Sequence, residues 1–323
     1  MPPPVVLGLD FGGSKIAAAV CEADGSRLTS ATVPTDALDG GLPNLRRGIA
    51  LAEELLVAAA PGRRLAAVGA CTFGIPQDDG VQLAPAIAGW GGLALGRELR
   101  KAFSGAEIRL ATDVKAAAAA EARWGALVDC DPGIYLNLGT GLAVAIVSNG
   151  SVLLGRNGAA GEIGYNLRER AEVGLRQGQR SMLEDAVSGM AMRRLGSAVA
   201  GEELTAEDVF VAADSDPRMA SLVADFTAEL CFHLVNLSIA IDPHRIAVGG
   251  GLARSWHRLQ PAIRRALDAA VPFPPELVVA DFPDDAPLRG AIALGTAALA
   301  DAIETADGIE AADVIQTDQR VRT

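Results

Sequence analysis

Two glycine-rich segments each follow an apolar run that is typical of a buried β-strand. The first is Leu9–Lys15, which reads Leu-Asp-Phe-Gly-Gly-Ser-Lys, and the second is Leu138–Gly141, which reads Leu-Gly-Thr-Gly. A phosphate oxygen approaches main-chain N–H groups closely only where side chains are absent, as they are at glycine. The repetition predicts two similar half-domains that bind one phosphate chain.

Polar side chains beside these glycines fit the same interpretation. Ser14 and Thr140 would add hydroxyl donors, and Asp10 ends its strand where Mg²⁺ on a nucleotide could be held directly or through water. Either segment alone is equally typical of an ordinary hairpin turn. Together they favour a nucleotide. The residues predicted to bind it are Asp10, Gly12, Gly13, Ser14, Lys15, Gly139, Thr140 and Gly141.

Two other phosphate-binding patterns fit the chain poorly. The sequence contains no Gly-x-x-x-x-Gly-Lys-Ser/Thr, which argues against a P-loop enzyme. A dinucleotide fingerprint starting at Gly139 fails because its third glycine position is Val144. Asn149-Gly150 is a type I′ turn signal between two apolar runs, so we expect a hairpin here rather than the start of a helix.

Composition and charge exclude several classes of protein. Half of the 323 residues are hydrophobic, and the net charge of −12 argues against a nucleic-acid partner. No apolar stretch reaches the ~18 residues of a membrane span, and the start lacks the basic residues of a secretory signal. We therefore expect a soluble cytoplasmic protein with no membrane partner. The four cysteines lack the spacing of a zinc or redox site, which indicates buried free thiols.

The order of expected elements indicates the fold class. The first part of the chain reads strand, strand, strand, helix, strand, helix, and a second strand pattern starts at Ile134. This is a ribonuclease-H-like pattern, the half-domain of actin-like phosphotransferases. We expect an α/β protein with two ribonuclease-H-like (actin-like ATPase) domains flanking an active-site cleft. The smaller would comprise 1–111 with about 295–323, and the larger 112–294. The first elements are expected at Val5–Leu9, Lys15–Cys21, Leu28–Val33, Leu42–Ala59 and Leu65–Thr72. Further along the chain, residues 182–200 are expected to be mainly helical.

The motifs in this order resemble those of the ROK family, which comprises bacterial sugar kinases and sugar-responsive repressors. The resemblance covers nearly the whole chain. Besides the two glycine-rich segments, it rests on Gly74-Ile75-Pro76, Ala84-Pro85, Gly89-Trp90, Thr112-Asp113, Gly161-Glu162-Ile163-Gly164, Leu183-Glu184 and Val248-Gly249-Gly250-Gly251. Repressors of the family carry a helix-turn-helix ahead of the first strand, and we expect none here because that strand starts at Val5.

The resemblance implies a role for several residues. Asp113 would be the general base that accepts a proton from the attacking sugar hydroxyl, although a strand-end Asp at the start of a helix is also typical of a plain N-cap. Glu162 and Glu184 would hold sugar hydroxyls, unless they are ordinary surface acids. The turn Gly249–Gly251 would lie near adenine and ribose, or is simply a tight strand-to-helix turn. Gly74 and Thr112 complete the residues expected near the sugar.

The chain departs from the family pattern at three positions. Thr112 and Lys115 stand where members have asparagine. Lys115 would favour the ionised form of Asp113 if the two are close, or contact a phosphate, or point to solvent. Tyr165 stands at the family's histidine, and no cysteine or histidine occurs in 166–181, so we predict no zinc. Tyr165 either donates its phenol to a sugar hydroxyl or packs as a half-buried aromatic.

The sequence therefore predicts an ATP-dependent, Mg²⁺-requiring kinase of a hexose, with glucose the default, or of a close derivative. The altered sugar positions keep an amino sugar or a cyclitol open as the substrate. A non-catalytic regulator that binds sugar or nucleotide on the same fold is the alternative from another class. The resemblance also implies a homodimer that forms through the larger domain.

Overall fold

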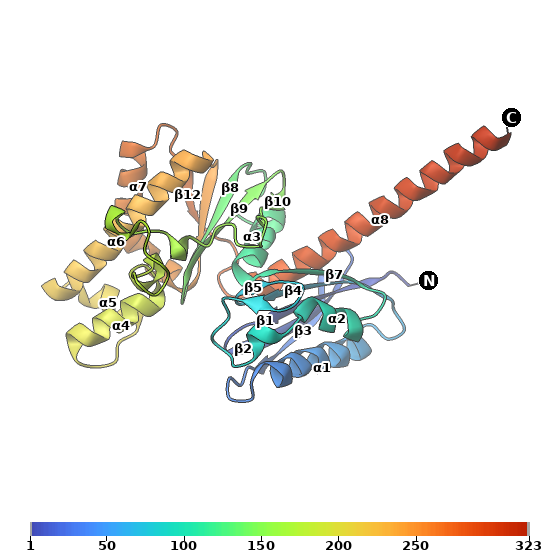
Figure 1. Cartoon of the computed structure of the whole chain (residues 1–323), viewed down its shortest axis with the longest axis horizontal. Coiled ribbons are helices and arrows are strands. Elements are labelled where there is room, and N and C mark those ends of the chain that lie inside the picture. The colour runs from blue at the N-terminus through green and yellow to red at the C-terminus, as the bar shows by residue number, and fades with distance from the viewer. Residues whose placement is uncertain (1, 322–323) are drawn as a thin grey trace. The chain divides into compact units, whose positions relative to one another are not determined.

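The computed structural model describes the backbone of residues 2–321 and the side chains of residues 2–305 (Figure 1). The chain divides into two compact units, Met1–Ala120 with Pro287–Thr323, and Glu121–Ala286. We call them unit 1 and unit 2. Unit 1 is built from two separate stretches of chain, because the final helix returns to the sheet formed by the first residues.

Unit 1 contains a five-stranded mixed sheet in the order β3-β2-β1-β4-β7. β2 is antiparallel to both of its neighbours, whereas β1, β4 and β7 are parallel. Parallel strands end at the same edge of a sheet, so the carboxyl ends of these three strands lie side by side. The strands are β1 (Val5–Phe11), β2 (Lys15–Glu22), β3 (Arg27–Pro34), β4 (Leu65–Thr72) and β7 (Glu107–Thr112).

Helices cover both faces of this sheet. Leu45 of α1 and Leu95 of α2 join Leu7, Leu9 and Phe11 in one buried cluster. Ile292 and Leu299 of α8 belong to smaller clusters with strand residues of the opposite face. The elements around the sheet are α1 (Gly41–Ala59), β5 (Ile75–Pro76), β6 (Val81–Gln82), η1 (Trp90–Gly92), α2 (Leu95–Ala102), α3 (Asp113–Trp124) and α8 (Ala286–Val321).

The helix α8 contacts the sheet backbone to backbone. A Cβ atom on Gly69 of β4 would lie 1.9 Å from the Ala291 carbonyl oxygen and 2.4 Å from the Gly295 nitrogen. A Cβ on Gly290 would lie 1.9 Å from the carbonyl oxygen of Ala116 in α3. Real Cβ atoms do not approach backbone atoms so closely, so only glycine fits at these contacts.

Unit 2 repeats the sheet of unit 1 strand by strand, in the order β10-β9-β8-β11-β12. β9 is again antiparallel to both neighbours, and β8, β11 and β12 are parallel. The β9–β10 hairpin turns at Asn149 and Gly150, with φ of 51° and 69°, as the sequence predicts. The strands are β8 (Gly133–Leu138), β9 (Leu142–Ser148), β10 (Ser151–Val152), β11 (Arg245–Gly249) and β12 (Glu276–Val279).

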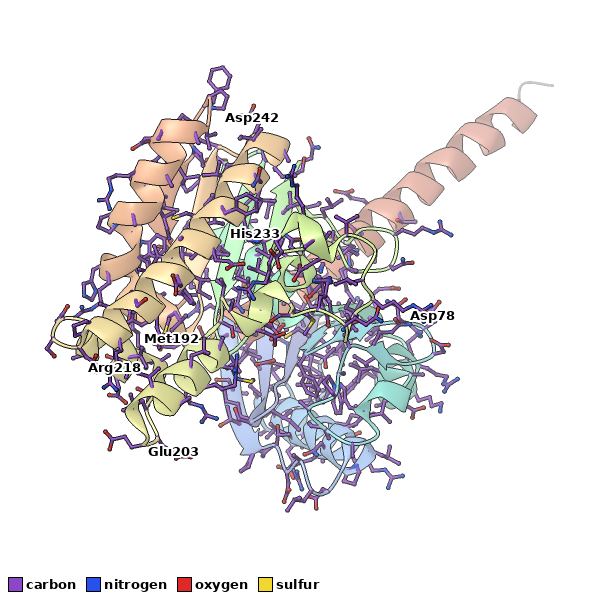
Figure 2. All side chains as sticks on the ribbon, turned by 60° about the vertical axis from the view of Figure 1, so that its left-hand side comes forward. Asp78, Met192, Glu203, Arg218, His233 and Asp242 are labelled. Carbon is purple, nitrogen blue, oxygen red and sulfur yellow. The ribbon has the colours of Figure 1, made fainter. Side chains whose placement is uncertain are left out.

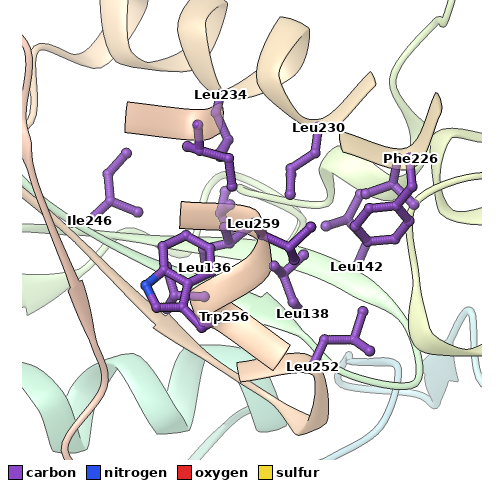
Figure 3. Close-up of a cluster of buried hydrophobic side chains, with 14 of the residues drawn as sticks. Leu136, Leu138, Leu142, Phe226, Leu230, Leu234, Ile246, Leu252, Trp256 and Leu259 are labelled. Carbon is purple, nitrogen blue, oxygen red and sulfur yellow. The ribbon is translucent and has the colours of Figure 1, made fainter. Parts of the chain in front are cut away.

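A core of leucine and aromatic side chains joins the second sheet to its helices (Figure 3). Leu136 and Leu138 of β8 are fully buried in it, together with Leu230 of α6 and Leu259 of α7. The helices of unit 2 are η2 (Ile163–Tyr165), η3 (Arg170–Glu172), η4 (Leu183–Asp185), α4 (Gly189–Ala200), α5 (Ala206–Ala212), α6 (Pro217–Ile241), η5 (Gly251–Ser255) and α7 (Trp256–Ala270).

The two matching sheets confirm the predicted α/β fold built from two ribonuclease-H-like halves. One local prediction is wrong: residues 182–188 do not open a long helix. Leu183–Asp185 is a short 3-10 turn, and α4 begins only at Gly189, where the Ser188 hydroxyl accepts a hydrogen bond from the Ala191 N–H.

Two described helices, Pro217–Ile241 and Ala286–Thr305, are long and apolar enough to cross a membrane by length and composition alone. By this criterion both helices exceed the length expected from the sequence for any apolar stretch, although α6 carries Asp225 and Glu229 within its span. Core helices of soluble proteins pass the same test, so the finding is weak evidence for a membrane.

The glycine contact of α8 generates a stability prediction. Gly69→Ala should lower the free energy of unfolding by about 2 kcal/mol or more, because the new Cβ overlaps the backbone of α8. Gly92→Ala is the matched control, since a Cβ there meets nothing within 4 Å. Chemical denaturation of both variants measures the difference, and equal stability of the two would contradict the contact.

Candidate active site

Three acidic or polar positions of unit 1 lie at the carboxyl ends of its parallel strands. Asp10 of β1 is directly opposite Cys71 of β4, and Thr72 is opposite Thr112 of β7. Asp113 follows Thr112 and begins α3. The register therefore brings Asp10, Thr112 and Asp113, which the sequence singles out separately, to one edge of one sheet.

Asp10 is only 7% exposed. Burial raises its pKa to about 6, the Cys71 thiol lowers it by donating a hydrogen bond, and the negative charge of Asp113 raises it further. The Cys71 sulfur lies 3.4 Å from Asp10 Oδ1 and 3.4 Å from the Pro287 carbonyl oxygen at the start of α8. The carboxylate of Asp10 is thus held in place, but its negative charge is only weakly compensated by its neighbours. Such a group is suited to binding a cation.

The carboxylate of Asp113 is fixed by a hydrogen bond, and its pKa is shifted by its surroundings. Burial raises its pKa, while the backbone N–H of Val114, 2.8 Å from Oδ1, and the charge of Lys115 lower it. Lys115 is 2% exposed, so the solvent-facing interpretation of this lysine is wrong. Its backbone N–H donates to Thr112 Oγ1 at 3.2 Å. The ammonium therefore belongs to the buried interior of unit 1, where it electrostatically favours the ionised carboxylate of Asp113.

The turn between β1 and β2 keeps its glycines accessible. The Gly12 N–H donates to the Lys15 carbonyl at 3.0 Å, and the Thr35 hydroxyl donates to the Gly12 carbonyl at 2.8 Å. Gly13, Ser14 and Lys15 are exposed. The turn is consequently fixed by its own backbone while its tip remains open to a ligand.

In unit 2, the two predicted nucleotide turns lie side by side. β8 and β11 are parallel neighbours, with Gly249 opposite Asn137. A Cβ on Gly250 would lie 2.5 Å from the Leu138 carbonyl carbon, so the turn after β11 packs directly on the turn after β8. Gly251, the last glycine of the run, begins η5 and has open space where its Cβ would be.

The start of α4 also contacts the turn after β8. The Gly189 N–H donates to the Gly139 carbonyl at 2.8 Å, and the Met190 N–H donates to the Thr140 carbonyl at 3.2 Å. The first N–H groups of α4 thus fix the conformation of Gly139–Gly141 by donating to the carbonyls of this turn.

The predicted sugar residues of unit 2 form one cluster beside this turn. Glu184 Oε2 accepts a hydrogen bond from the Leu142 N–H at 2.7 Å, and a Cβ on Gly141 would lie 2.3 Å from the same oxygen. Tyr165 is half-buried, and its pKa is raised by burial and by the charges of Glu184 and Glu162. Glu184 is half-buried as well, which disfavours its interpretation as a plain surface acid.

Gly74 lies in the turn after β4, with φ of 76°, and a Cβ there would lie 2.7 Å from the Gln82 carbonyl oxygen. The predicted residues therefore form two groups, one in each unit. Across the side chains that the structure describes, no cluster of three or more His, Cys, Asp or Glu could hold a metal ion.

Sequence reasoning missed three residues that contact these groups. Cys71 could have been found by pairing the two predicted strands that end in Asp10 and Thr72. Gln177, which hydrogen-bonds the Tyr165 phenol, and Arg180, which donates to the Tyr165 carbonyl, lie in a segment without periodicity, so no sequence signal marks them.

The chain is similar to known sugar kinases in sequence and in fold. A glucokinase of Halalkalibacterium halodurans is 29% identical over 281 residues, covering 81% of this chain and 85% of that protein. The crystal structure of a ROK hexokinase from Thermus thermophilus has a TM-score of 0.78 at 30% identity, covering 92% of this chain and 99% of that chain. A ROK glucokinase from Streptomyces griseus in complex with glucose and AMPPNP has a TM-score of 0.70 at 27% identity, covering 90% and 99%.

Fold and likenesses together define a sugar phosphotransferase with the actin-like ATPase fold. The chain belongs to the ROK family, whose model matches residues 6–298.

The buried carboxylate generates a pH prediction for the protein without Mg²⁺ or nucleotide. The pKa of Asp10 is about 6 in the folded state against an ordinary 3.8, so ionisation costs folding stability as pH rises through this window. Asp10→Asn removes that cost. The stability of the variant relative to wild type should increase by up to about 3 kcal/mol between pH 4 and pH 7. Thermal unfolding at both pH values measures it, and a pH-independent difference would contradict the assignment.

Proposed function

We propose that this protein transfers the γ-phosphoryl group of ATP to a hydroxyl group of a hexose or a hexose derivative. The observation that carries the proposal is the placement of Asp113. It begins α3 at the sheet edge that also holds Asp10, with its carboxylate fixed by the Val114 N–H and its ionised form favoured by Lys115. Such a base accepts the proton that the sugar hydroxyl loses as it attacks phosphorus.

Mg²⁺ fits the donor set at Asp10. A buried carboxylate with a raised pKa gains most from a nearby cation, and carboxylate oxygen is a ligand that Mg²⁺ prefers. When bound with the nucleotide, the ion supplies neutralisation of phosphate charge. Asp10 would hold it directly or through water, Cys71 keeps the carboxylate oriented, and the Gly12–Lys15 turn offers N–H and hydroxyl donors to phosphate.

The residues proposed to bind the nucleotide and the sugar are chosen for the chemistry of their backbone turns and side chains. The paired turns at Gly139–Gly141 and Gly249–Gly251 would bind the nucleotide. The cluster of Glu162, Tyr165 and Glu184 combines two hydroxyl-accepting carboxylates with one phenol, a set that orients a polyol. We also propose Thr112 and Gly74 as residues that contact the sugar. Glucose is the default substrate, and the altered positions Thr112 and Tyr165 keep amino sugars and cyclitols in the test panel.

The decisive experiment is an assay of ADP release across hexoses, amino sugars and cyclitols with Mg²⁺ and ATP. Asp113→Asn should lower kcat by about 10²- to 10⁴-fold with the preferred sugar, because the general base is lost. Asp79→Asn, an exposed acid of unit 1, is the matched control and should retain full activity. If wild type turns over no sugar yet binds one tightly, the protein is a regulator rather than a kinase.

Lys115 generates a pH prediction for the same assay. Its charge lowers the pKa of Asp113, so Lys115→Met should raise that pKa and keep the base protonated up to a higher pH. The acidic limb of the kcat/KM profile is expected to move upward by roughly one pH unit. An unchanged limb, or one displaced to lower pH, would show that Lys115 does not tune the base.

We further propose a cytoplasmic homodimer. ATP as the donor implies the cytoplasm, and α6 supplies an apolar surface for self-association, since Phe232 and Ile239 are 58% and 52% exposed and lie two helical turns apart. Sedimentation at micromolar concentration should give twice the chain mass, and Phe232→Glu should give a single chain. A monomeric wild type would refute the dimer.

A further inference from the structure

Between η2 and η4 the chain forms a long loop, residues 166–182, with one short 3-10 turn at Arg170–Glu172. Tyr165 precedes this loop and Glu184 follows it. A loop of this length holds a fixed conformation only if specific contacts offset the entropy of ordering it. The positions of both sugar-site residues therefore depend on what fixes the loop.

The guanidinium of Arg180 binds the backbone directly after η2. Its Nη2 donates to the Tyr165 carbonyl at 2.6 Å, and its Nη1 donates to the Asn166 carbonyl at 3.1 Å. The planar guanidinium presents donors in a rigid arrangement, so two successive carbonyls are held at once. The far end of the loop is thereby joined to its beginning, directly after Tyr165.

A second set of contacts joins the loop to α6. Arg168 Nε and Nη2 donate to the two carboxylate oxygens of Glu229 at 2.6 Å and 2.9 Å. The Arg168 N–H donates to Glu172 within the loop at 2.7 Å. Asn166 Nδ2 lies 3.3 Å from Nδ1 of His233, which is 6% exposed on the same helix (Figure 2). Glu229 and His233 are one helical turn apart, so a single face of α6 receives residues 166 and 168.

The phenol of Tyr165 is itself bound from the loop. A side-chain hydrogen bond joins it to Gln177, whose Nε2 also lies 3.8 Å from the Met182 sulfur. Backbone and side chain of Tyr165 are thus contacted from the same polar segment.

We propose that Arg180, Gln177 and the Arg168–Glu229 pair form a polar clamp that positions Tyr165 and Glu184 for sugar binding. The inference rests on the proposed sugar kinase function and names residues that determine its sugar affinity. They are positioning residues, because they act through Tyr165 and the loop rather than through the sugar. In the described part of the chain, these residues form no hydrogen bond with the residues proposed to bind ATP. Loss of the clamp should therefore weaken the binding of the sugar more than the binding of ATP.

The clamp is tested by kinetics of Arg180→Met, Arg180→Lys and Arg176→Met. Arg180→Met should raise KM for the sugar by roughly tenfold or more while KM for ATP stays within about twofold. Arg180→Lys should raise the sugar KM less than Arg180→Met does. An ammonium can donate to one of the two carbonyls, but it lacks the planar guanidinium that holds both at once. Arg176 is exposed in the same loop and serves as the matched control, with unchanged constants expected.

A double-mutant cycle on Arg168→Met and Glu229→Gln tests the second contact. If the pair acts as a unit, the double variant should raise the sugar KM no more than either single variant does. Independent, multiplying effects would show that the two side chains do not work together and would overturn this part of the clamp. An unchanged sugar KM in Arg180→Met, or equal rises of both KM values, would overturn its central part.

Amide hydrogen exchange of the unliganded protein tests the clamp independently of the proposed kinase activity. Arg180→Met should accelerate exchange at residues 165–182 and leave α1 unaffected, whereas a general loss of stability would accelerate both and contradict the clamp. If wild type phosphorylates no sugar, the proposed function fails. Faster local exchange then still supports the clamp as a loop-ordering device, and unchanged exchange overturns it.

Discussion

The direct contact of the α8 backbone with β4 and α3 is the constraint on which unit 1 depends. Glycine at positions 69 and 290 lets the helix lie within van der Waals distance of strand and helix backbones. The same helix supplies the Pro287 carbonyl beside the Cys71 thiol, which in turn touches Asp10. The carboxylate of Asp10, which is unfavourable to bury, is therefore oriented by a thiol that also contacts a helix from the far end of the chain.

Much of the fold could be predicted because strand ends carry a strong signal. β4 was predicted at Leu65–Thr72, where the structure has it, and the Asn149-Gly150 turn forms as expected. The start of α4 was predicted too early, because Leu183-Glu184-Asp185 has helical composition. A 3-10 turn and the Ser188 cap replace the helix there, since the Glu184 carboxylate is bound to the Leu142 N–H of β9. Tertiary contact overrides local propensity in this case.

The candidate site was predictable in its residue types but not in its supporting contacts. Asp10, Asp113 and the glycine turns were recognised from motif order, and sheet register then places them at strand ends. Lys115 could not be placed from the sequence alone. A lysine side chain usually extends into solvent, whereas here the packing of unit 1 buries it. Arg180 and Arg168 could not be found from sequence, because their partners lie in η2 and α6 and arginines in a polar loop are usually solvated.

One oxygen of Glu184 occupies the space where a side chain at position 141 would begin. The two positions, far apart in the sequence, are therefore linked. A side chain at position 141 would make the flexible end of Glu184 move, and the carboxylate would then lose the hydrogen bond that it accepts from the Leu142 N–H. Engineering residue 141 would thus also displace a residue of the sugar cluster.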